Sequence, residues 1–214
     1  SMKYPAQAII PYASRLARLA PHVQQLYMES LGKSVSPQGQ PLSQPAGTII
    51  FGEPGTNAQH SFFQLAHQGN AFPIDFIGVK TPGYTGTQAI SKGVTNHQEL
   101  WANLLAQAGA LALGRSGDNP AKNFDGNRPS TIIILDNLEP ESVGMLLAFY
   151  EARTVLEGFI LGVNPFDQFG VELGKVMAGD IRKEMAARNL DLSYTFSCAS
   201  KTDNFYLELL FNKR

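Results

Sequence analysis

The strongest pattern in the sequence is a series of short apolar segments, separated by longer stretches in which apolar residues recur at helical spacing. The apolar segments are residues 8–10, 48–51, 72–79, 131–135 and 158–163. Because they are apolar at nearly every position instead of every second one, they are typical of strands buried on both faces of a parallel sheet.

The stretches between these segments predict helices at residues 12–29, 57–68, 96–113, 140–156, 166–187 and 202–211. The alternation predicts an α/β fold with a doubly wound, mostly parallel sheet between two helical layers, a three-layer αβα sandwich. Two polar stretches, 34–46 and 114–129, interrupt the alternation. We expect them to be exposed loops of one domain spanning residues 1–214.

Composition narrows the possible partners. Hydrophobic residues make up 43% of the chain and charged residues 16%, with a formal net charge of −1. Without a cluster of Lys and Arg, we expect neither nucleic acid nor an anionic membrane as a partner. No apolar run reaches the ~18 residues of a membrane span, and Cys198 has no second cysteine to pair with. These features favour a cytoplasmic protein, and Ser1 followed by Met2 indicates a segment of a longer one.

The turn at residues 52–57 follows an apolar segment and opens a predicted helix. Its backbone N–H groups could bind an anion, or Thr56 and Asn57 could simply cap the helix. His60 falls in the first turn of that helix, and it is either a proton-transfer residue or a structural one. His67 lies two turns further on, too far to share a metal ion with His60, so no metal site is expected.

Two further segments contain possible acid–base residues. Glu29 ends an amphipathic helix for which Gly32 is a suitable cap, and it is either a general base or a solvated surface residue. Gln168 and Lys175 are placed on one face of the predicted helix 166–187, directly after an apolar segment. Ligands of α/β proteins bind at such positions, although Lys175 could instead form a solvated ion pair with Glu172.

Four blocks of sequence together point to a known family. They are MESLGK at 28–33, GEPGTNAQH at 52–60, GNRPS at 126–130 and FDQFGVELGK at 166–175. In these blocks and their order the chain resembles the C-terminal part of the glucose-6-phosphate isomerase family over nearly its whole length. Leu31, Ala58 and Phe169 depart from the usual family residues, but none of them replaces a catalytic group.

The resemblance implies a role for each candidate. Glu29 corresponds to the base that moves a proton between C2 and C1 of the open-chain sugar through a cis-enediol. His60 and Lys175 correspond to residues that open the sugar ring, and Gln168 to a residue that contacts the substrate. The family acts on hexose 6-phosphates as a homodimer, in which the histidine reaches the neighbouring subunit's site, and it needs no metal or organic cofactor.

The resemblance also implies that an N-terminal domain of the parent enzyme is absent, with its phosphate-binding loop and a charge-stabilising arginine. We therefore expect the chain alone to be weakly active or inactive. Three alternatives stay open: a non-catalytic sugar-phosphate-binding or regulatory module, an isomerase of another hexose phosphate such as mannose 6-phosphate, and a secreted signalling role.

Overall fold

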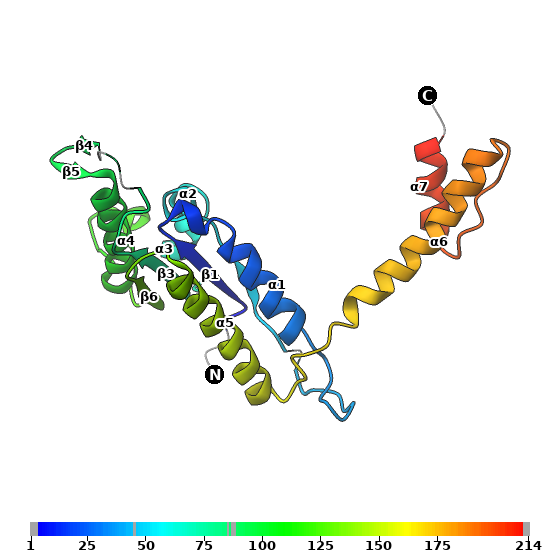
Figure 1. The fold of residues 1–214 in the computed structure, drawn as a ribbon, viewed down its shortest axis with the longest axis horizontal. Coiled ribbons are helices and arrows are strands. Elements are labelled where there is room, and N and C mark those ends of the chain that lie inside the picture. Colours follow the sequence, from blue (N-terminus) through cyan, green and yellow to red (C-terminus); the bar gives the residue numbers. More distant parts are fainter. Residues whose placement is uncertain (1–3, 45, 85, 87–88, 212–214) are drawn as a thin grey trace. The chain divides into compact units, whose positions relative to one another are not determined.

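The structure, a computed structural model, describes residues 4–44, 46–84, 86 and 89–211. Contacts divide the chain into two compact units, Ser1–Phe166 and Asp167–Arg214, where the sequence had predicted one domain. Each unit has its own fold (Figure 1).

The first unit is built around a four-stranded parallel sheet. Its strands are β1 (Ala6–Pro11), β2 (Ile49–Phe51), β3 (Ile74–Val79) and β6 (Ser130–Leu135), and their order across the sheet is β2-β1-β3-β6. Ala8 of β1 pairs with Phe51 on one side and with Ile74 on the other. The strands predicted within residues 8–10, 48–51, 72–79 and 131–135 are thereby confirmed.

Helices cover both faces of this sheet. One face carries α1 (Leu19–Leu31) and α5 (Pro140–Leu161), and the other carries α2 (Gly55–Gln59), α3 (Phe63–Gln68) and α4 (Asn96–Leu113). Side chains alternate along β3, so that Ile77 packs in the cluster with α1 and α5 while Phe76 packs in the cluster with α3 and α4. The predicted doubly wound α/β fold is confirmed.

The prediction of a fifth strand at residues 158–163 is wrong. Helix α5 continues through Leu161 and ends at Gly162, which adopts the left-handed conformation with φ of 70°. The N–H of Val163 then bonds to the carbonyl of Gly158, 2.9 Å away. The apolar run is therefore the last turn of a helix, and its glycine is the residue that ends it.

Other boundaries also differ from the predictions. The helix predicted from residue 12 begins with a short 3-10 turn at Ser14–Leu16, before α1. The helix predicted at 57–68 is divided into α2 and α3. An unpredicted hairpin joins β4 (Ile90–Ser91) to β5 (Val94–Thr95) through residues 92 and 93, both with positive φ.

The two predicted loop regions have some regular structure. Residues 34–44 lie mostly on the surface, where Val35 bridges to Pro41. In the region 114–129, a 3-10 turn at Pro120–Lys122 lies between Arg115 and Phe124, which form an antiparallel bridge.

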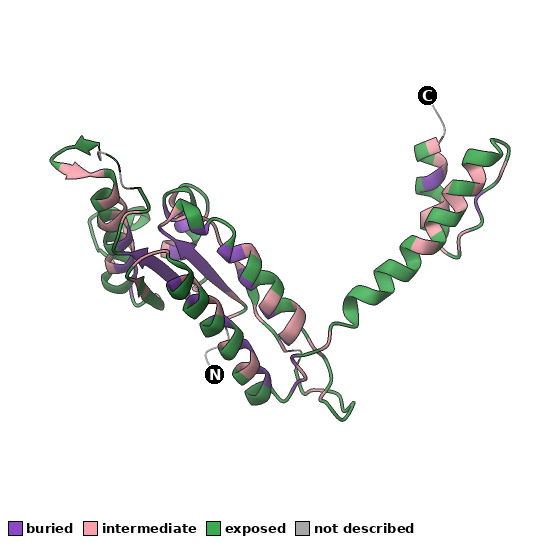
Figure 2. Cartoon of the chain, in the orientation of Figure 1, coloured by how far each residue is buried: buried purple, intermediate pink, exposed green. Residues whose placement is uncertain are grey.

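Strand β6 is an edge strand with one incompletely covered face. Ile133 and Leu135 pack against the cluster with α1 and α5. Ile132 and Ile134 point to the other face and remain 38% and 52% exposed. In Figure 2 the strands β1 and β3 form the buried centre, whereas β6 contains exposed residues.

The second unit contains α6 (Gly170–Leu190) and α7 (Lys201–Phe211). Arg188 of α6 donates a 2.6 Å hydrogen bond to Glu208 of α7, and its guanidinium lies 4.7 Å from the ring centroid of Phe196. Phe196 and Leu207 are buried. A small apolar centre with one ion pair therefore holds the two helices together.

Candidate functional site

Glu29 lies in the last turn of α1 and is half-buried. The other side of this helix presents Val23, Tyr27 and Leu31 to the core, which fixes the rotation of α1 against the sheet. The ammonium of Lys33 donates to the backbone carbonyl of Glu29 at 2.6 Å. Glu29 therefore sits at a firmly packed helix end, with its side chain partly open to solvent.

A glycine pair brings another segment against this helix end. Gly47 has φ of 99°, and a Cβ atom built on it would lie 3.1 Å from the Cα of Gly32. The N–H of Ala46 also bonds to the carbonyl of Lys33. The absence of a side chain at Gly47 allows this close approach, whereas a Cβ atom on Gly32 would instead lie 2.6 Å from the carbonyl oxygen of Met28.

A chain of polar contacts ties the same helix to α5 and the sheet. The hydroxyl of Tyr27 donates to the carboxylate of Glu157 on α5. Arg153, one turn earlier, lies 3.7 Å from Glu157 and 3.2 Å from Asp75 of β3. Its guanidinium is also 5.6 Å from the centroid of the Tyr27 ring. These contacts restrain α1 two residues before Glu29.

Burial raises the pKa of two carboxyl groups in this chain of contacts. It raises the pKa of Glu157. It also raises the pKa of Asp75, and this effect outweighs the opposing influence of Arg153 and of hydrogen bonds from Tyr150, Gln7 and Arg153 itself.

His60 lies elsewhere than predicted on its helix. It directly follows α2 as the C-terminal cap, instead of standing in the first turn of a longer helix. Its side chain is exposed. Among the residues that the structure describes, none forms a hydrogen bond with its imidazole.

The turn before His60 has a packing role. Gly52 has φ of 152°, and a Cβ atom there would lie 2.0 Å from the carbonyl oxygen of Ile9. A Cβ atom on Gly55 would collide with the ring of Tyr12, whose hydroxyl accepts a 2.8 Å hydrogen bond from Gln59. The glycines of GEPGTN thus allow β2 and α2 to pack closely on β1.

The first unit does not bring Glu29 and His60 together. Helix α1 follows β1 and returns antiparallel to it, so that Glu29 lies toward the amino ends of the strands. Helix α2 begins just after the carboxyl end of β2, and Figure 1 shows it at the other end of α1. The two residues therefore lie near opposite ends of the strands.

Gln168 and Lys175 belong to the second unit. Gln168 precedes α6 by two residues and is not part of the helix, which corrects the prediction that both share a helical face. Lys175 lies in the second turn of α6, and both side chains are exposed.

The contacts that support α1 were not singled out from the sequence. Arg153 and Glu157 are four residues apart on α5, a spacing that favours an ion pair, but Glu157 lies one residue beyond the helix predicted at 140–156. Their partners Tyr27 and Asp75 lie in other elements, so the group becomes evident only in the fold.

Within the described ranges, no three His, Cys, Asp or Glu side chains form a group that could hold a metal ion. No described helix is both long and apolar enough to cross a membrane.

Comparison with protein families gives a match over most of the chain. The family described as phosphoglucose isomerase matches residues 1–201. A glucose-6-phosphate isomerase from Desulfosudis oleivorans is 65% identical over 212 residues, which cover 99% of this chain and 39% of the relative. The cytosolic glucose-6-phosphate isomerase of Arabidopsis thaliana is 48% identical over 196 residues and is covered to 34%.

Solved structures agree with this match. The crystal structure of a glucose-6-phosphate isomerase from Chlamydia trachomatis aligns with a TM-score of 0.83 and 41% identity, over 97% of this chain and 38% of that one. A hypothetical protein from Thermus thermophilus aligns with a TM-score of 0.68 and 29% identity. The chain thus spans about two fifths of the length of these relatives.

Proposed function

Because this chain belongs to the phosphoglucose isomerase family, we propose that the protein it forms part of interconverts glucose 6-phosphate and fructose 6-phosphate. The observation that carries the proposal is the 65% identity with a glucose-6-phosphate isomerase over 99% of the chain. The family match extends through residue 201, and therefore includes Glu29, His60, Gln168 and Lys175.

In the proposed mechanism Glu29 is the general base. Its carboxylate takes the proton from C2 of the open-chain aldose, and the resulting cis-enediol accepts the same proton at C1 to give the ketose. A proton also moves from the hydroxyl on C2 to the oxygen on C1, so that substrate and product are isomers with no net oxidation. His60 and Lys175 assist ring opening, and Gln168 contacts the substrate near the reacting carbons.

The position of Glu29 supports this role. It lies at the end of a helix held by the Tyr27–Glu157 contact and by packing of Leu31, while its own side chain remains half-open to solvent. A base must be held in a defined position and still be reachable by the substrate. The end of α1 provides both conditions.

We also propose a cytoplasmic homodimer in which His60 acts in the site of the neighbouring subunit. Two features support a shared site: His60 is exposed, and it lies near the opposite end of the strands from Glu29. The relatives include cytosolic enzymes. Since the chain covers only 39% of a relative, we expect it to have little activity without the rest of the protein.

The direct test is the replacement of Glu29 in the full-length protein. We expect Glu29→Gln to lower kcat by about a thousandfold or more with a small change in KM, because the amide cannot take the proton. Conversion of fructose 6-phosphate to glucose 6-phosphate is the measurement. Glu151→Gln, a matched change at an exposed position of α5, should leave kcat unchanged.

Two outcomes would contradict the proposal. A Glu29→Gln variant as fast as the parent would remove Glu29 from the mechanism. A full-length parent that binds hexose 6-phosphates without isomerising them would favour the non-catalytic binding module instead.

A further inference from the structure

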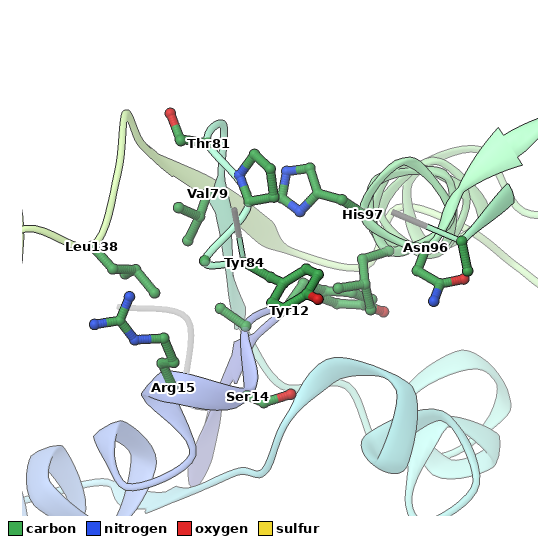
Figure 3. Close-up of a pocket in the computed structure, with 14 residues that line it drawn as sticks. Tyr12, Ser14, Arg15, Val79, Thr81, Tyr84, Asn96, His97 and Leu138 are labelled. Carbon is green, nitrogen blue, oxygen red and sulfur yellow. The ribbon is translucent and has the colours of Figure 1, made fainter. Parts of the chain in front are cut away.

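A cavity of about 490 Å³ opens at the carboxyl ends of β1 and β3. Its walls are formed by residues that directly follow these strands, together with the start of α4 and Leu138. Figure 3 shows Arg15 beside Leu138 on one side of this place, Tyr12 and Tyr84 in its middle, and His97 and Asn96 on the other side. None of the residues proposed for isomerisation lines it.

The topology of the sheet explains why a cavity forms here. From β1 the chain continues through α1 on one face of the sheet, whereas from β3 it continues to α4 on the opposite face. The two connections therefore separate between the neighbouring strands β1 and β3. Such switch points are where open α/β sheets bind their ligands.

The polar part of the lining favours an anion. Arg15 supplies a guanidinium, and a Cβ atom built on Gly83 would lie only 3.2 Å from its Cδ, so the Arg15 side chain runs along the loop after β3. Among the described residues, no carboxylate lies within ion-pair distance of Arg15, and none lines the cavity. On the side of the cavity away from Arg15, Asn96 and His97 begin the 18-residue helix α4, whose positive dipole end adds to the positive potential there.

The hydrogen-bonding groups of the cavity are held in place by the fold. The imidazole Nε2 of His97 lies 3.0 Å from the carbonyl oxygen of Lys80 and donates to it, which leaves Nδ1 for another partner. Thr95 caps α4 with a reciprocal pair of hydrogen bonds to Gln98. Ser14 and Thr81 add hydroxyl groups.

The remaining walls are apolar or aromatic. Val79, Leu100 and Leu138 supply aliphatic surface, and Tyr12 and Tyr84 supply rings. A ligand that matches both parts carries an anionic group and a hydrophobic body. The cavity volume lies within the ~300–1,000 Å³ of typical small-molecule sites.

We propose that this cavity binds a small organic phosphate monoester that carries a ring, with the phosphate at Arg15 and the ring against Tyr12, Tyr84 and Leu100. The forked guanidinium of Arg15 matches the oxygens of a phosphate group. This site is additional to the proposed isomerisation, and its binding does not depend on that activity.

The single tryptophan of the chain gives a direct readout. Trp101 follows the lining residue Leu100, and its indole Nε1 donates a 2.9 Å hydrogen bond to the carbonyl of the lining residue Val79. Phenyl phosphate is a suitable probe because it joins a phosphate to a ring. We expect it to change Trp101 fluorescence saturably in the 214-residue chain, with phenol giving no saturable change and inorganic phosphate binding more weakly.

Matched arginine variants test the site itself. Arg15→Gln should weaken phenyl phosphate binding by about tenfold or more. Arg18→Gln removes the same charge three residues away, from an exposed side chain outside the cavity, and should leave binding within about twofold. Both positions are exposed, so the variants should fold like the parent, which circular dichroism will verify.

Three results would overturn the proposal. The first is the absence of a saturable change with phenyl phosphate. The second is an equal loss of binding in Arg18→Gln, which would indicate non-specific attraction by surface charge. The third is equal binding of phenol, which would remove the phosphate from recognition.

Discussion

Asp75 is a buried carboxyl group that receives hydrogen bonds from three side chains. Gln7 donates to its Oδ2 at 2.9 Å, and Tyr150 and Arg153 each donate at 3.2 Å. In the sequence it is the one charged residue of the apolar segment 72–79, which is the local sign of a buried polar group. Its partners lie up to 78 residues away, so their identity required the fold.

The raised pKa of Asp75 predicts how stability depends on pH. The folded chain holds the Asp75 proton more tightly than the unfolded chain does. Its contribution to the free energy of unfolding is therefore fully present below the ordinary value of 3.8 and is lost as the pH rises through the raised pKa. Asp75→Asn cannot titrate. The stability of the parent minus that of the variant should therefore fall across this window and then level off.

Urea unfolding followed by Trp101 fluorescence at a series of pH values measures this difference. Glu157 is present in both proteins, so its own raised pKa should largely cancel. A difference that grows with rising pH would show that attraction by Arg153 outweighs burial.

Sequence patterns predicted the elements well where the chain is buried on both faces, and less well where an apolar run has two explanations. Residues 158–163 contain the apolar content of a buried strand, but residues 158–161 continue helix α5 without a break and Gly162 ends it. The hairpin at 90–95 was missed because Lys92 adopts a positive φ that lysine rarely takes, so that only Gly93 indicates the turn in the sequence. The candidate residues Glu29, His60, Gln168 and Lys175 could be selected from the sequence because each lies in a short contiguous block, and their roles stay predictions.

Replacement by alanine should change the free energy of unfolding in opposite directions at two glycines, one that ends a helix and one inside a helix. Gly162 ends α5 with φ of 70°, whereas Gly109 lies inside α4. A Cβ atom at either position meets nothing within 4 Å, so only backbone conformation distinguishes them. Gly162→Ala should lower the free energy of unfolding by about 1 kcal/mol, since alanine disfavours the left-handed region. Gly109→Ala should raise it by about 0.5–1 kcal/mol.

Urea denaturation of both variants and the parent, followed by Trp101 fluorescence, gives the sign of each change in the free energy of unfolding. Changes of equal sign would contradict the assignment of Gly162 as the end of α5. They would instead be compatible with the extended segment predicted from the sequence.

At the scale of the whole molecule, the separation of Glu29 and His60, together with the proposed homodimer, predicts complementation between inactive subunits. In the full-length protein, Glu29→Gln and His60→Ala should each abolish most activity. In a mixed dimer, the intact Glu29 of one subunit meets the intact His60 of the other, so one site of two is complete. Random mixing should recover about a quarter of the parental activity, because half of the dimers are mixed.

The assay is isomerisation after the two variants are denatured and refolded together. Each variant refolded alone is the control. Activity of the mixture no higher than that of the separate variants would place His60 in the site of its own subunit.

The uncovered edge of β6 has a consequence for the chain in solution. Its residues, STIIIL, include no charge and no proline, and within the described part of the chain no strand pairs with its outer side. An open row of backbone N–H and C=O groups beside exposed isoleucines is a template for adding a strand from another molecule. Concentrated solutions of the 214-residue chain should therefore aggregate through intermolecular β-pairing at this edge, and a net charge of −1 offers little repulsion to oppose it.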